Sequence, residues 1–130
     1  MTCNLPRLAL DSKSKEEFLE KVSSIFDITA KINNAKRNLI KKRIESGAAP
    51  LYSHGFMDLS KQYSTMGITG MYEALDILGF NILTEEGQNF AVEMLNMLNE
   101  KINLANKKFK SPHNLEKISK LNTLNLNIAK

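Results

Sequence analysis

The residues best suited to hold a ligand are gathered in one short stretch, residues 64–70, which reads STMGITG. Two hydroxyl side chains, Ser64 and Thr65, precede two glycines, Gly67 and Gly70. Glycines let backbone amides approach a ligand closely, and the amino end of a following helix favours an anion. The spacing is not that of a dinucleotide fingerprint, and it lacks the lysine of a P-loop. Spacing alone therefore favours an ordinary helix cap, with a backbone-lined binding site as the alternative.

The other candidate residues are scattered along the chain. Asn4 lies close to a proline on an expected strand, where its side chain could bond a ligand or satisfy a neighbouring backbone group; the residues leave both open. His54 and His113 are far apart, and Cys3 has no partner at a metal-ligand spacing. We therefore predict no metal site and expect both histidines in loops or on the surface.

A basic run at residues 36–43, KRNLIKKR, is the one strongly charged segment. Leu39 and Ile40 interrupt it on what should be the buried side of a helix, so a solvated helix face is favoured over a phosphate-binding surface. Aromatic residues are not interleaved with the bases, and the net charge is only +4. Binding to nucleic acid is accordingly not expected.

The composition is that of one ordinary globular domain. The chain has 130 residues, of which 42% are hydrophobic, and a single cysteine, so no internal disulfide can form. No secretory signal is visible, and no stretch approaches the roughly 18 apolar residues that a membrane span needs. These features predict a cytoplasmic protein without a membrane anchor.

Periodic apolar residues predict a mainly α fold with one or two short strands. Helices are expected over roughly 15–46, 68–79 and 85–109, with Ser14 and Thr84 as N-caps and Gly47 after the first helix. The start of the chain, residues 1–10, predicts a short strand, and a weak strand or disorder is expected around residues 124–128. The apolar stripe of the first helix comprises Phe18, Val22, Ile25, Thr29, Ile32, Leu39 and Ile44, widened by Ile28 and Ile40.

Three motifs, taken in order, resemble one enzyme family. They are NLPRLAL at residues 4–10, PLYSHGFMDLSKQYSTMGITGMYEALDILGF at residues 50–80 and SPHNLE at residues 111–116. Together they are similar to the class III anaerobic ribonucleotide reductases, which reduce ribonucleoside triphosphates to deoxyribonucleotides by glycyl-radical chemistry. The resemblance covers residues 1–117 and implies a slice of the family's ten-stranded α/β barrel.

The resemblance also implies roles for particular residues. Asn4 matches an asparagine of the family's active-site barrel that is implicated in handling formate or substrate. Residues 64–70 match a loop leading into a helix that packs on the barrel, so Ser64, Thr65, Gly67 and Gly70 are candidate substrate contacts. Cys3 is not the family's radical cysteine, because that residue belongs further upstream, on a finger loop.

What the chain lacks shapes the functional expectation. It shows no glycyl-radical motif and no four-cysteine zinc cluster, and the resemblance stops at Lys117, leaving residues 118–130 as an unmatched tail for which a weak strand or disorder is expected. We therefore expect a fragment of the reductase that is inactive alone and holds no cofactor of its own. Its partners would be the remaining reductase segments, a ribonucleoside triphosphate would bind only in the complete enzyme, and the glycyl radical would be installed by a radical-SAM activase.

The alternative from another class is a small, independently folded helical binding module with a mildly basic face. A cooperative thermal transition of the isolated chain would favour the module. Exposed apolar surface and a molten state would favour the fragment, because its helices would then lack the rest of the barrel.

Overall fold

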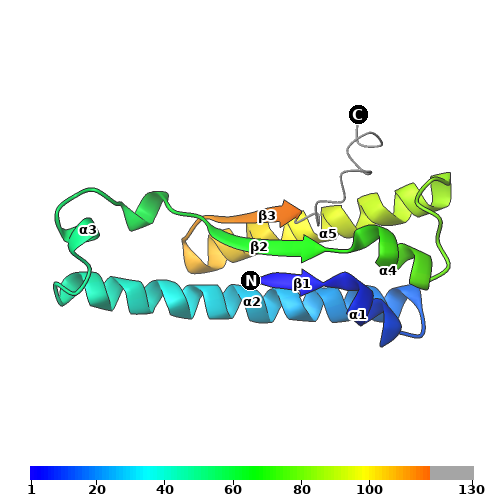
Figure 1. The fold of residues 1–130 in the computed structure, drawn as a ribbon, viewed down its shortest axis with the longest axis horizontal. Coiled ribbons are helices and arrows are strands. Elements are labelled where there is room, and N and C mark those ends of the chain that lie inside the picture. Colours follow the sequence, from blue (N-terminus) through cyan, green and yellow to red (C-terminus); the bar gives the residue numbers. More distant parts are fainter. Residues whose placement is uncertain (118–130) are drawn as a thin grey trace.

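The computed structural model describes residues 1–117, which form a small parallel sheet with helices packed on it (Figure 1). The elements are β1 (Thr2–Asn4), α1 (Leu5–Leu10), α2 (Lys15–Glu45), α3 (Pro50–Ser53), the 3-10 turn η1 (Leu59–Lys61), β2 (Ser64–Thr69), α4 (Met71–Ile77), α5 (Glu85–Phe109) and β3 (His113–Lys117). No helix in residues 1–117 is long and apolar enough to cross a membrane.

All three strands are parallel, in the order β1-β2-β3. Parallel neighbours need a long crossover, which α2 provides between the first pair and α5 provides between the second. Figure 1 shows both long helices running back against the direction of the strands. Because α2 and α5 also pack on each other, they cover the same face of the sheet.

The hydrophobic core lies between this covered face and the helices. Strand side chains alternate between the two faces, so Cys3, Met66 and Ile68 point toward the helices and are buried. Each large side chain that is fully buried contributes about 1.5–3 kcal/mol to the free energy of unfolding. The most completely buried large side chains are Phe18, Phe90, Leu5, Met66, Ile68, Leu75, Met94, Leu98 and Val22.

Local signals predicted the two long helices correctly. The Ser14 hydroxyl accepts the Glu17 backbone N–H at 3.2 Å, and the Thr84 hydroxyl accepts that of Gly87 at 3.2 Å, so both expected N-caps are confirmed. Gly47 follows α2 with a φ of +75°, the left-handed backbone expected of a residue that ends a helix.

Two expected boundaries are wrong. Residues 5–10 form helix α1 and not a strand, because Pro6 is accommodated in the first turn of a helix, where its missing N–H costs nothing. The helix expected at 68–79 begins only at Met71, and Ile68 belongs to strand β2. The helical spacing from Ile68 to Met71 and Leu75 was coincidental, since Ile68 reaches the core from a strand.

The sheet therefore has three strands, where one or two were expected. β2 and β3 were missed because their pairing is not local, and each is stabilised by a neighbour far away in the sequence. The weak strand expected around residues 124–128, and the tail it belongs to, lie outside the described residues.

Two side chains expected at the surface are buried. Arg37, assigned to the solvated basic face, is 7% exposed, and His113 is 3% exposed, whereas His54 is at the surface as expected. Conversely, part of the predicted apolar stripe of α2 faces outward: Ile28, Ile32 and Leu39 are 51%, 38% and 53% exposed.

Candidate functional site

The sheet face that points away from α2 and α5 carries the candidate site. Strand alternation places seven residues there, all of them polar or glycine. We call this set the polar sheet face; it consists of Thr2, Asn4, Thr65, Gly67, Thr69, Asn114 and Glu116. Within residues 1–117, the helices that pack on the strands are α2 and α5, both on the opposite side. A sheet face that lacks apolar side chains is built to meet water or a polar ligand, not a hydrophobic core.

The strand register brings these residues into neighbouring rows. Thr65 lies beside Asn114 in the first row. In the second, Gly67 lies between Thr2 on one side and Glu116 on the other, so the row has no side chain at its centre.

The third row is at the carboxyl ends of the strands, where Asn4 lies beside Thr69. Ligands of open parallel sheets bind at this end, because the following loops and helix starts converge there. Helices α1 and α4 begin at this edge and pack against each other. The Asn4 carboxamide oxygen accepts the Arg7 backbone N–H at 3.2 Å and so caps α1. Of the two roles left open for Asn4, satisfying a nearby backbone group is therefore present.

The structure brings together only part of the expected set. Asn4, Thr65 and Gly67 share the polar sheet face, whereas Ser64 lies on the opposite side, where its hydroxyl is 3.4 Å from Nη1 of Arg37. Residues 64–69 form strand β2 instead of the expected loop, so these side chains project from a strand.

Gly70 has a packing role at the entrance to α4. Its φ is +75°, and a Cβ at this position would lie 2.5 Å from Cδ of Pro6. The residue therefore permits the close approach of α1 and α4.

Sequence reasoning missed four residues of the polar sheet face: Thr2, Thr69, Asn114 and Glu116. The available signal was the period-two alternation of polar with buried residues, for example Thr2 and Asn4 on either side of Cys3. Asn114 is notable because its side-chain oxygen is shielded from solvent and has no hydrogen-bond partner in the part of the chain that the structure describes. Glu116 is the single ionisable side chain of this face.

The cysteine and histidines do not join the site. Cys3 points into the core, and burial raises the pKa of its thiol to about 11, so it is protonated at neutral pH. The Nδ1 atom of His113 lies 3.0 Å from both the Asn106 side-chain oxygen and the Ser111 backbone oxygen, on the helix side of the sheet. No group of three or more potential metal ligands occurs in residues 1–117.

Comparison with known proteins identifies the relatives of this arrangement. The family profile "Anaerobic ribonucleoside-triphosphate reductase" matches residues 1–118 of the 130. The chain belongs to this family. The reductase family is one of glycyl-radical enzymes, as the sequence motifs implied.

Solved structures of anaerobic ribonucleotide reductases share the fold of this family member. The enzyme of Thermotoga maritima with dATP bound in its specificity site is 32% identical, with a TM-score of 0.82, over 88% of this chain and 21% of that one. The same enzyme in complex with dATP and CTP gives the same identity, TM-score and coverage. The reductase-family chain thus spans about a fifth of the length of these relatives. A comparison with curated proteins gave no match.

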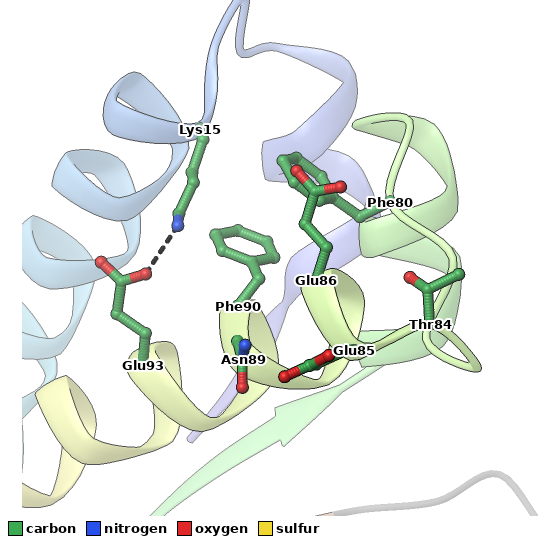
Figure 2. Close-up of a pocket in the computed structure, with 8 residues that line it drawn as sticks. All are labelled: Lys15, Phe80, Thr84, Glu85, Glu86, Asn89, Phe90 and Glu93. Atoms are coloured by element: carbon green, nitrogen blue, oxygen red, sulfur yellow. Dashed lines mark ion pairs between the residues drawn. The ribbon is translucent and has the colours of Figure 1, made fainter.

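One hollow of the reductase-family chain lies at the start of α5, and no residue of the polar sheet face lines it (Figure 2). It measures about 630 Å³ and carries no residue of the expected site. The Lys15 ammonium lies 2.6 Å from a Glu93 carboxylate oxygen and 4.8 Å from the centroid of the Phe90 ring, which stacks on Phe80. Lys15 therefore already supplies the cation that Glu93 and the Phe90 ring favour, and these contacts hold the start of α2 against α5.

Proposed function

We propose that this chain forms three strands of the barrel of an anaerobic ribonucleoside-triphosphate reductase and directs its polar sheet face toward the nucleotide. The observation that carries the proposal is the division of the sheet: one face is packed by helices, and the other is polar. In a closed α/β barrel, helices cover the outside and alternate strand residues point inward, so an interior lined by polar side chains and glycine suits a polar ligand better than a packed core. The likeness to reductase structures supports this orientation.

The proposed role of the polar sheet face is to position substrate. The Asn4 amide group and the hydroxyls of Thr65 and Thr69 can hydrogen-bond a ribose or its phosphates, and the Glu116 carboxylate can accept from a ribose hydroxyl. Such contacts hold the sugar in one orientation, and correct positioning of reacting groups can lower a barrier by several kcal/mol.

Radical chemistry would come from other segments of the enzyme. Cys3 is unsuited to the radical role because it points away from the polar sheet face and is packed in the core. The radical cysteine and the radical-storing glycine would lie in those segments, and an activase would install the radical there. The substrate would be a ribonucleoside triphosphate, and the reaction would take place in the cytoplasm. The chain alone is then inactive.

Complementation tests this proposal. The purified chain is incubated anaerobically with CTP and activase, alone and together with a T. maritima reductase from which the matching segment has been deleted. We expect the deleted enzyme and this chain to associate on size-exclusion chromatography and to form dCTP only as a mixture. Formation of dCTP by the chain alone would overturn the proposal, as would failure of the two proteins to associate.

A further inference from the structure

A second hollow lies on the helix side of the sheet, in the groove between α2 and α5. Its volume is about 270 Å³, and its apolar lining comes from Leu104 and Phe109 of α5, with the nearly buried Phe26 of α2 and Met66 of β2 beneath them. None of these residues belongs to the polar sheet face. The groove is smaller than the 300–1,000 Å³ that is typical of pockets for drug-sized ligands, so it fits a body of one or two rings.

Three lysines, Lys31, Lys101 and Lys108, also line this groove. Lys101 is neutralised by Asp27, whose two carboxylate oxygens lie 2.9 and 3.1 Å from its ammonium. No carboxylate of residues 1–117 is within ion-pair distance of the other two ammonium groups. Lys108 lies 5.5 Å from the centroid of the Phe109 ring, which places its charge beside the apolar lining.

We infer that this groove binds a small organic anion, whose apolar body enters between α2 and α5 and whose charged group lies beside Lys31 and Lys108. An inorganic anion would gain nothing from the apolar lining. A neutral apolar molecule would gain nothing from the two ammonium groups, and an organic cation would be repelled by them. The inference is independent of the proposed reductase role, because it concerns the opposite side of the sheet.

Titration with 2-naphthoate tests the inference on the full 130-residue chain. We expect saturable binding of one molecule per chain, with a Kd on the order of 0.1–1 mM for a ligand of this size. Chemical-shift changes in NMR spectra should centre on the methyl groups of Met66 and Ala105, which line the groove. The neutral analogue 2-naphthol and the small anion acetate should each bind at least about fivefold more weakly, since each lacks one of the two recognised parts.

Paired lysine variants provide the control. Replacing both Lys31→Gln and Lys108→Gln should weaken 2-naphthoate binding about fivefold or more, because both ammonium groups are lost. Both side chains are exposed, so the fold should be unaffected. Lys107→Gln, on the same helix but outside the groove, should change the Kd less than about twofold. The absence of saturation, equal binding of 2-naphthol, an equal effect of Lys107→Gln, or shifts centred elsewhere would each overturn the inference.

Discussion

At the scale of single residues, the covered and open faces of the sheet give neighbouring side chains opposite chemistry. Cys3 and Asn4 are adjacent in sequence, yet one is sealed in the core and the other lies exposed beside Thr69 at the carboxyl end of the sheet. Asn4 both caps α1 and belongs to the polar sheet face, and a cap uses only its carboxamide oxygen. Its side-chain NH2 group is therefore the part that the proposed substrate role requires.

The buried Cys3 thiol should react slowly in the folded chain. Its pKa is raised by burial from 9.0 to about 11, which lowers the thiolate fraction at pH 8 about 100-fold. We expect its reaction with a disulfide reagent at pH 8 to be at least about 100-fold slower in the native chain than in urea. Because the pKa of the thiol is higher in the folded chain than in the unfolded chain, Cys3 does not change the free energy of unfolding below pH 9. Its ionisation lowers that free energy as the pH rises from 9 toward 11. Equal rates in native and unfolded chains would show that Cys3 is not sealed.

Gly70→Ala should strongly destabilise the fold. The new Cβ would clash with the Pro6 ring, and the φ of +75° is unfavourable for alanine. We expect the free energy of unfolding, measured with urea, to fall by about 3 kcal/mol. Gly47→Ala is the matched control, because Gly47 has the same φ but no atom within 4 Å of the added Cβ, and it should cost only about 1 kcal/mol. Equal losses for the two variants would refute the packing role of Gly70.

At the scale of elements, the entry to β2 depends on one side chain of α2. The Arg37 guanidinium donates to the backbone oxygens of Gln62, at 2.9 Å, and of Leu59. These bonds tie the irregular segment before β2 to the helix and so set where the strand begins. Arg37 thereby supports the polar sheet face without belonging to it.

Arg37→Gln should loosen this entry. We expect a loss of about 2 kcal/mol in the free energy of unfolding, since hydrogen bonds from a charged group are removed and two partly buried carbonyl groups lose their donor. Amide hydrogen exchange should accelerate first in residues 59–69. Lys36→Gln, at an exposed neighbouring position, should change stability by less than about 0.5 kcal/mol. Unchanged exchange in residues 59–69 of Arg37→Gln would contradict the proposed tie.

Elements formed by interactions between residues close in sequence were predicted well, whereas elements formed by pairing between distant residues were not. Helices α2 and α5 were predicted nearly to their ends because Ser14 and Thr84 act on backbone groups three residues away. Strand β2 was missed because its two buried side chains, Met66 and Ile68, are too few to show a period. Asn114 and Glu116 of the polar sheet face were missed because β3 gains its place only by pairing with β2, which is far away in the sequence.

At the scale of the whole molecule, the core and the surface favour different accounts of the chain. The core extends through α1, α2, α4, α5 and the sheet, which supports folding of the chain by itself, as the alternative binding module would require. The outward Ile28, Ile32 and Leu39 of α2 instead suit a chain that meets further protein. Family membership, together with the span of about a fifth of the reductase length, favours a reductase fragment over an independent binding module.

The most direct test of the central claim is the rate of dCTP formation by a T. maritima reductase in which residues 1–117 replace the matching segment. Asn4→Ser keeps a residue able to cap α1 but removes the amide group, so we expect kcat/KM to fall about tenfold or more with little change in Tm. Ser64→Ala, on the helix side of the sheet, should stay within about twofold of the parent chimera. Equal activity of Asn4→Ser and the parent, or an equal loss with Ser64→Ala, would contradict the claim that the polar sheet face holds the nucleotide.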